Sequence, residues 1–273
     1  MKQFKHIITS GCSFSDSSNN YSWPLQLKTS FDIDSTDLGL SSQGNGLIAR
    51  KVLHAVHDNI EQGVDPQDIL VGIMWSGPDR HDMYFHGLTE QLDRSVKDVD
   101  TMNKNPTSYV KNDPGGWLIM NHHWKEERSK RYYAYFHDSI HQRILTYEKI
   151  LWVQDRLKML GVNYFMTTFM DEVFSGYYHD NPNITWMRKL IDWSNWLPVS
   201  SMHKWCYKYW NDADFVQWPY QVKETGEWHT VVDSHPTQVM HKRFVEEIIL
   251  PHIKKNFPNY YCPEFKEFIS DHV

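Results

Sequence analysis

The alternation of apolar and polar stretches along the chain predicts four β-strands. Residues 5–11 contain a short apolar run that stops at Gly11, and residues 69–75 form a longer run of mainly apolar side chains. A run of this kind is typical of a central strand in a parallel sheet, where both faces are covered. Residues 162–168 give a further strand, and residues 32–40 give a weaker one.

Apolar residues at helical spacing predict helices between these strands. Long helices are expected over residues 45–62, 132–160 and 236–255, and a short helix with Pro24 in its first turn is expected over 23–30. Alternating strands and helices imply an α/β fold. In this fold a mainly parallel, doubly wound sheet forms the middle layer of a three-layer sandwich with right-handed crossovers.

Two stretches interrupt the alternation and are interpreted as aromatic-rich or polar insertions. Residues 77–130 are polar, carry several prolines and show no sustained period, so we expect an insertion over the sheet edge. Residues 170–230 are rich in tryptophan, with short helices expected at 183–195 and 199–210. This second stretch is either a lid that faces the substrate or a cap that completes the core. We therefore predict one domain over residues 1–273 with these two insertions.

Composition and charge exclude several classes of partner. A chain of 273 residues suits one large α/β domain. The formal net charge is −6 without a run of basic residues, which argues against nucleic acid. Three cysteines without a CxxC pair argue against a zinc or redox motif, and no metal or other cofactor is predicted.

The hydropathy of the chain also bears on its location. The first residues lack the apolar segment of a signal peptide, and no apolar window is long enough to cross a membrane. We therefore expect no membrane partner and a cytoplasmic location, or a virion-associated one if the protein is encoded by a phage. Aromatic residues make up 15% of the chain, which indicates either a large core with aromatic-lined loops or a surface for flat or sugar-like ligands.

Candidate chemistry stands near the two ends of the chain. Ser13 follows the first predicted strand directly, and open α/β sheets bind ligands at the carboxyl edge of their strands. Asp233 and His235 stand just before the last predicted helix, and serine, histidine and a carboxylate are the parts of a nucleophilic triad. Each feature alone also fits a turn or a helix cap, but their joint occurrence favours a hydrolase site. Cys12 is a possible alternative nucleophile, although we expect it to be a small buried residue.

The residues at both ends resemble the SGNH (GDSL-like) hydrolase family. The first block reads Gly11-Cys12-Ser13-Phe14-Ser15, where the family usually has Gly-Asp-Ser-Leu, and the last block reads Asp233-Ser234-His235-Pro236. The resemblance implies a flavodoxin-like sheet, Ser13 as nucleophile, His235 as general base and Asp233 as the carboxylate that orients it. The family carboxylate usually stands three positions before the histidine, where this chain has Val232, whereas Asp233 stands two before.

The resemblance also implies donors for the oxyanion and the substrate. The second family block supplies a backbone amide, which points to Gly44, with Ser42 as the alternative and Asn45 as a further side-chain donor. The third block usually supplies an asparagine after the central strand, but this chain reads Trp75-Ser76-Gly77-Pro78-Asp79-Arg80 there. Ser76 or Arg80 would have to replace that donor.

The function implied by the resemblance is that of a serine esterase. It would hydrolyse a small acyl ester, such as an O-acetyl group on a carbohydrate, so a small-molecule or glycan ester is the expected partner. Two alternatives stay open: a catalytically weak or inactive SGNH-like module for binding or assembly, in keeping with similar phage proteins, and an acyltransferase. A metal site at His122 and His123 is a weaker candidate, because adjacent residues do not share a face of a helix or strand.

Overall fold

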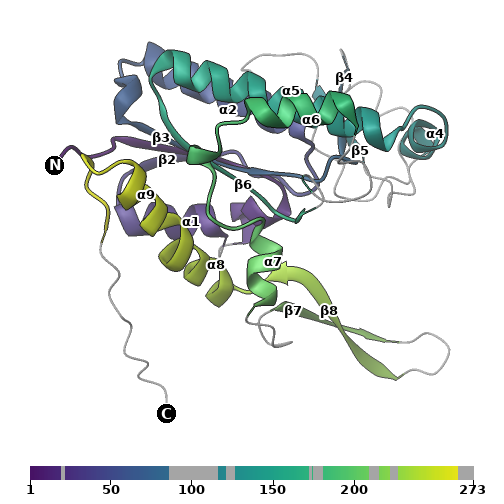
Figure 1. Ribbon diagram of the computed structural model, residues 1–273. Helices are drawn as coiled ribbons and strands as arrows, with labels where there is room; N and C mark the ends of the chain where they lie inside the picture. The colour runs from purple at the N-terminus through teal and green to yellow at the C-terminus, as the bar shows by residue number, and fades with distance from the viewer. Residues whose placement is uncertain are drawn as a thin grey trace.

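The computed structural model places the ends of the parallel strands, and with them the candidate residues, at one edge of a central sheet (Figure 1). Elements are named in chain order as the figures label them. The structure describes residues 1–19, 22–85, 116–120, 127–171, 174, 181–208, 215–221 and 227–263.

The central sheet has four strands in the order β2-β1-β3-β6, and all neighbours are parallel. The predicted mixed α/β fold with a mainly parallel sheet is therefore confirmed. The central strand β3 is buried at every position, which explains its continuous apolar sequence. The weak second strand is shorter than predicted. The bounds are β1 (His6–Ser10), β2 (Asp34–Asp37), β3 (Ile69–Trp75) and β6 (Asn163–Thr168).

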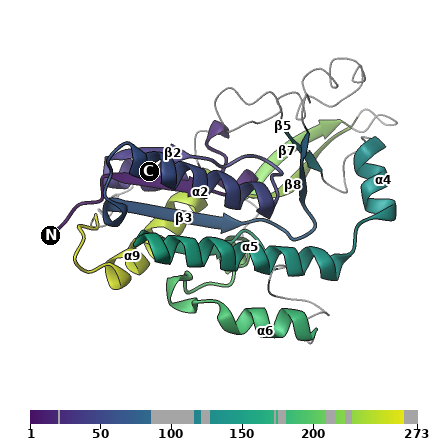
Figure 2. The same ribbon diagram turned by 90° about the horizontal axis from the view of Figure 1, so that it is seen from above.

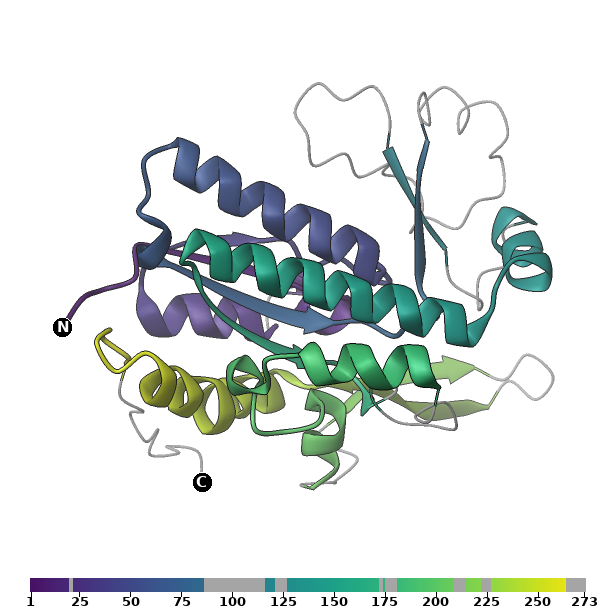
Figure 3. The same cartoon turned by 45° about the horizontal axis from the view of Figure 1, so that its top comes forward.

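Helices cover both faces of this sheet (Figure 1). Alternate strand residues point to opposite faces, so Ile8 and Val71 join one apolar core while Ile7 and Leu70 join the other. The first core is closed by α2 (Asn45–Glu61), α5 (Ser139–Leu160) and α6 (Pro182–Leu190), and α5 lies beside α2 and α6 (Figure 3). The second is closed by α1 (Trp23–Phe31), α8 (Gln238–Phe244), the π-helical turn Val245–Ile249 and α9 (Leu250–Asn256).

The long helix predicted over 132–160 is instead two helices, α4 (Glu127–Tyr135) and α5. Asp138 begins α5, because its side chain accepts a hydrogen bond from the His141 backbone N–H at 2.7 Å. Gly161 ends α5 in the left-handed conformation, with φ of 74°, as predicted for a C-terminal glycine. The prediction of a single helix was wrong because it followed the apolar stripe and ignored this cap.

Both predicted insertions contain strands that sequence periodicity did not show. In the first, β4 (His81–Phe85) pairs with β5 (Gly116–Met120) in antiparallel fashion. In the second, α7 (Met202–Tyr207) precedes β7 (Phe215–Gln221), which pairs with β8 (Trp228–Pro236). Both strand pairs lie beyond the carboxyl ends of the parallel strands (Figures 1 and 2). They therefore flank the edge at which an α/β sheet binds ligands.

Candidate active site

Ser13 and His235 lie together at the carboxyl edge of the sheet. The Nε2 atom of His235 is 2.7 Å from the Ser13 Oγ atom, although 222 positions separate the two residues in the chain. Ser13 begins a 3₁₀ turn just after β1, and His235 lies at the end of β8, just before α8. A serine hydroxyl in hydrogen-bond contact with an imidazole is the arrangement of a nucleophile and its general base.

The turn that carries Ser13 is fixed by its neighbours. A Cβ atom at Gly11 would collide with the Ser15 side chain and lie 2.9 Å from the Met74 carbonyl oxygen, so this position requires glycine. The Ser15 backbone N–H donates to the Cys12 carbonyl at 2.8 Å and closes the turn. Cys12 and Phe14 are buried in the core, whereas Ser13 between them is partly exposed. The prediction that Cys12 is a small buried residue is therefore confirmed.

Aromatic packing supports the imidazole of His235. The Phe14 ring lies 5.0 Å from the His235 ring, centroid to centroid, at an interplanar angle of 42°. On its other side, Phe14 meets Phe169 edge to face, with centroids 5.4 Å apart. Phe169 follows β6, so a residue at the end of a second strand packs against the Phe14 ring that contacts the general base. Phe14 therefore places an aromatic ring directly against the imidazole.

A buried hydrogen-bonded chain beneath the site was not predicted from the sequence. The Trp23 indole N–H donates to Ser15 Oγ at 2.8 Å, and the Trp23 backbone N–H donates to His241 Nδ1 at 3.1 Å. Complete burial, with a smaller electrostatic effect of the neighbouring His235, lowers the pKa of His241 to about 3. His241 is therefore neutral at physiological pH. These hydrogen bonds connect the Ser13 turn to α1 and to α8, the helix that follows His235.

The loop after β2 is bonded to the Ser13 turn. The Asp16 carboxylate accepts hydrogen bonds from the Ser41 N–H and hydroxyl, at 2.9 and 2.8 Å, and from the Ser18 N–H at 3.0 Å. Burial alone would raise the pKa of Asp16, but these hydrogen bonds bring it below its usual value. The Gln43 side chain is fully buried and donates to the Gly11 carbonyl. The loop thus holds the turn in place with polar contacts on both sides.

Gly44 does not offer its amide to an oxyanion, contrary to the prediction. Its backbone N–H donates to Asp82 Oδ1 at 2.8 Å, and the Leu47 N–H donates to Asp82 Oδ2 at 2.9 Å. Asp82 thereby caps the amino end of α2 from the neighbouring strand β4. A Cβ atom at position 44 would lie 2.7 Å from the Arg80 carbonyl oxygen, so close packing explains this glycine. Asp82 stands 38 positions away, and the local sequence gave no sign of it.

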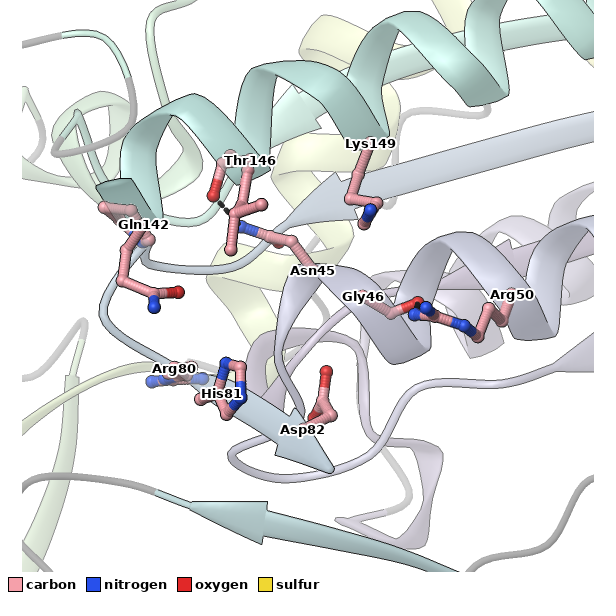
Figure 4. Close-up of a pocket in the computed structure, with 11 residues that line it drawn as sticks. Asn45, Gly46, Arg50, Arg80, His81, Asp82, Gln142, Thr146 and Lys149 are labelled. Atoms are coloured by element: carbon pink, nitrogen blue, oxygen red, sulfur yellow. Dashed lines mark hydrogen bonds between the residues drawn. The ribbon is translucent and has the colours of Figure 1, made fainter. Parts of the chain in front are cut away.

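The Asn45 side chain serves the fold and not the predicted oxyanion site, whereas the buried Ser76 hydroxyl has no hydrogen-bond partner among the described residues. The Asn45 side-chain N–H₂ group donates to Thr146 Oγ1 at 3.1 Å (Figure 4) and to the Ser76 carbonyl at 3.0 Å. Its side-chain carbonyl accepts from the Ser76 N–H at 2.8 Å. Both residues are buried. Together they form a clasp between the start of α2, the end of β3 and α5, so the donors of Asn45 are already used.

Arg80 keeps unused donors near the candidate site. Its guanidinium lies over the Phe169 ring at 4.9 Å from the centroid, and Phe169 in turn contacts Phe14. The Arg80 Nη1 atom is buried and has no hydrogen-bond partner among the described residues. Ser42, the alternative amide donor, adopts a left-handed conformation with φ of 66° in the loop that contacts Gly11. Arg80, the Ser42 amide and the Ser76 hydroxyl, which is also buried without a partner among the described residues, are the remaining candidates for an oxyanion donor.

Other predicted residues lie outside the described part of the structure. Asp233 belongs to β8, but its side chain lies outside the description, and so do His122 and His123. The orienting role of Asp233 therefore stays a prediction. Within the described ranges, no group of three or more metal-binding side chains comes together, and no helix is long and apolar enough to cross a membrane.

Neither a family model nor a curated protein matches the chain. What the protein does must therefore be argued from the residues at the sheet edge and from their geometry.

Proposed function

We propose that the protein is a serine hydrolase that cleaves an ester through Ser13 and His235. The observation that carries the proposal is the 2.7 Å separation of Ser13 Oγ and His235 Nε2. Ser13 Oγ attacks the ester carbonyl carbon while its proton moves to His235 Nε2. The C–O bond then breaks and the alcohol leaves with that proton. Water attacks the acyl-enzyme in the same way, so the acid is released and Ser13 regains its hydrogen.

We assign the orientation of His235 to Asp233. The two residues stand two positions apart near the end of β8. A carboxylate beside the second imidazole nitrogen holds the tautomer in which Nε2 can accept the serine proton. His241 does not replace it, because its Nδ1 atom already accepts the Trp23 N–H.

Arg80, with the Ser42 amide, is the proposed oxyanion donor in place of the missing asparagine. The donors of Gly44 and Asn45 are engaged in other hydrogen bonds. By contrast, Arg80 Nη1 is buried without a partner in the described structure. A cation at this position would stabilise the negative charge that develops on the carbonyl oxygen.

We also propose that the sheet is doubly wound in the flavodoxin-like manner and that the protein is related to the SGNH hydrolases. The parallel strands follow the order second, first, third, fourth along the chain, which agrees with the start of the flavodoxin-like order. Helices lie on both faces of the sheet, Ser13 follows the first strand and His235 precedes the last helical segment. These features support a doubly wound, SGNH-like sandwich. O-acetyl groups on a carbohydrate remain the proposed substrate class.

A binding or assembly module is the second candidate. The specific observation in its favour is that two predicted donor positions, Gly44 and Asn45, are committed to Asp82 and to the Ser76 clasp. A site with fewer free donors would bind an ester and turn it over slowly, since one lost oxyanion donor costs about 10²–10³-fold in rate.

Hydrolysis of short acyl esters and acetylated sugars by the parent protein and by Ser13→Ala decides between the two functions. We expect the variant to lose at least about 10⁴-fold in kcat, because the nucleophile is gone. Its unfolding temperature should stay the same. Ser30→Ala is the matched control, since Ser30 lies in α1 and its hydroxyl donates to the Gln26 carbonyl at 2.9 Å. A Ser13→Ala variant as active as the parent would exclude Ser13, and an inactive, folded parent would favour the binding module.

A further inference from the structure

A pocket separate from the Ser13–His235 pair lies between α2, β4 and α5. Its volume is about 170 Å³, well above the roughly 10–15 Å³ that one water molecule needs. Figure 4 shows side chains from all three segments around it. Those that matter for its chemistry are Asn45, Arg50, Arg80, Asp82, Thr146 and Lys149.

The lining carries an excess of positive charge. Arg50, Arg80 and Lys149 line the pocket, whereas Asp82 is the acidic residue among the described lining residues. The Asp82 carboxylate already accepts the N–H groups of Gly44 and Leu47, so its charge is offset by the end of α2. The pocket is therefore positive as a whole.

The cations of the pocket keep donors that the described protein does not use. Lys149 has no ion-pair partner among the described residues and points from α5 toward α2 in Figure 4. Arg50 donates one hydrogen bond to the Gly46 carbonyl at 2.9 Å, and its guanidinium lies over the Trp117 ring at 4.9 Å from the centroid. A guanidinium held flat in this way presents its remaining N–H groups in a fixed fork, which suits an oxyanion.

Arg80 links the pocket to the candidate active site. It lines the pocket, and its guanidinium also lies over Phe169, which contacts Phe14, the residue after Ser13. Its neighbour Asp79 does not neutralise the pocket, because Asp79 Oδ1 lies 3.0 Å from His137 Nε2. A molecule that occupies the pocket would thus extend toward the Ser13 turn across Arg80.

We propose that this pocket binds an anionic group, a carboxylate, sulfate or phosphate, on the molecule whose ester Ser13 attacks. The link to the ester rests on the proposed hydrolase function, whereas the binding of the anion does not. The expected substrate is therefore an acylated glycan that carries an acidic group. Arg50 and Lys149 hold that group from opposite elements, and neither belongs to the Ser13–His235 pair.

Matched sugars test the charge requirement directly. We would titrate the protein with glucose, glucuronate, glucose 6-sulfate and glucose 6-phosphate, and follow the side-chain and backbone N–H signals of α2 and α5 by NMR. We expect at least one anionic sugar to shift these signals while glucose does not, and the three anions identify the preferred group. Added salt should weaken the binding, because partly exposed charges are screened. Equal binding of glucose, or no binding of any anion, would overturn the proposal.

Variants at Lys149 locate the binding. Loss of one charge-assisted contact in Lys149→Gln should weaken the anion about tenfold, whereas Lys149→Arg should retain it. Lys189→Gln is the matched control, since Lys189 is an exposed lysine of α6 that does not line the pocket. Arg50→Gln serves as a second variant if Lys149→Gln fails to fold. An unchanged affinity in both folded variants would place the anion elsewhere.

The Ser13→Ala variant separates the two proposals. It should bind the anionic sugar as the parent does, because the pocket does not include Ser13. Binding of the anionic sugar without any hydrolysis by the parent would support the anion pocket and exclude the hydrolase function. Hydrolysis that depends on Ser13, without anion binding, would exclude the anion pocket and support the hydrolase function.

Discussion

The Ser13 turn and the start of α2 lie at the same edge of the sheet, but their polar groups are used differently. In the turn, Cys12 and Phe14 are buried and Ser13 is left partly exposed against His235. At the start of α2, the N–H donors of Gly44 and Asn45 are hydrogen-bonded to Asp82, Ser76 and Thr146. Buried polar groups must be paired, so the second region serves the fold and the first is free for chemistry.

The comparison shows why position alone does not define a site residue. Both regions were predicted from the sequence to contribute to the site, and both follow parallel strands. What separates them is whether distant elements supply partners, as β4 supplies Asp82 and α5 supplies Thr146.

Among substitutions that test this contrast, the largest effect is expected from Arg80. Arg80→Met should lower kcat for ester hydrolysis by roughly 10²–10³-fold, because it removes the proposed oxyanion donor. Arg80→Lys should recover part of the rate, since it restores a charge without the planar fork. The unfolding temperature should change little. If kcat is kept and only KM rises, then Arg80 binds the ground state and not the oxyanion.

Asn45→Ala, unlike Arg80→Met, should lower the stability of the fold more than the rate of hydrolysis. Its clasp joins three elements, and the change would strand the buried Ser76 N–H and open a small cavity. We expect a loss of about 2–4 kcal/mol in the free energy of unfolding, measured by denaturant titration. Asn59→Ala is the control, because the buried Asn59 donates only to the Ala55 carbonyl of its own helix at 2.9 Å. Equal losses in the two variants would argue against a special clasp.

The smallest effect concerns His241 and the pH dependence of stability. Burial lowers its pKa from the ordinary 6.5 to about 3, so below pH 6.5 the unfolded chain binds a proton that the folded chain does not. Its contribution to stability is complete above pH 6.5 and is lost as the pH falls toward 3, by up to about 1.4 kcal/mol per pH unit.

The variant His241→Asn isolates this contribution. Asparagine can still accept the Trp23 N–H but does not titrate, so the free energy of unfolding should vary less steeply between pH 6.5 and 4. His141→Asn on the exposed side of α5 should leave the slope unchanged. An identical slope in His241→Asn would mean that His241 is not held neutral in the folded protein.

Much of the fold could be predicted because it depends on local patterns. The continuous apolar run over 69–75 gave β3 with its observed bounds, and the apolar stripe over 45–62 gave α2 within one residue at its end. The strand β7 was missed, because Pro219 and a mixture of polar and aromatic residues argue against a strand when read locally.

Only part of the candidate site could be predicted from the sequence. Ser13 and His235 could be proposed from the sequence, because each stands at the border of a strongly patterned element. The roles of Gly44, Asn45 and His241 could not, since Asp82, Thr146 and Trp23 reach them from distant parts of the chain. Their partners are set by tertiary packing, which leaves no mark on the neighbouring residues.

A serine-reactive fluorophosphonate would show whether His235 activates Ser13. We would incubate the folded protein with the probe and locate the adduct by peptide mass spectrometry. We expect a single label on Ser13, formed much more slowly in His235→Ala, because the base that takes the hydroxyl proton is gone. Absence of the label on the folded parent, or labelling of Ser13 at the same rate in His235→Ala, would contradict it.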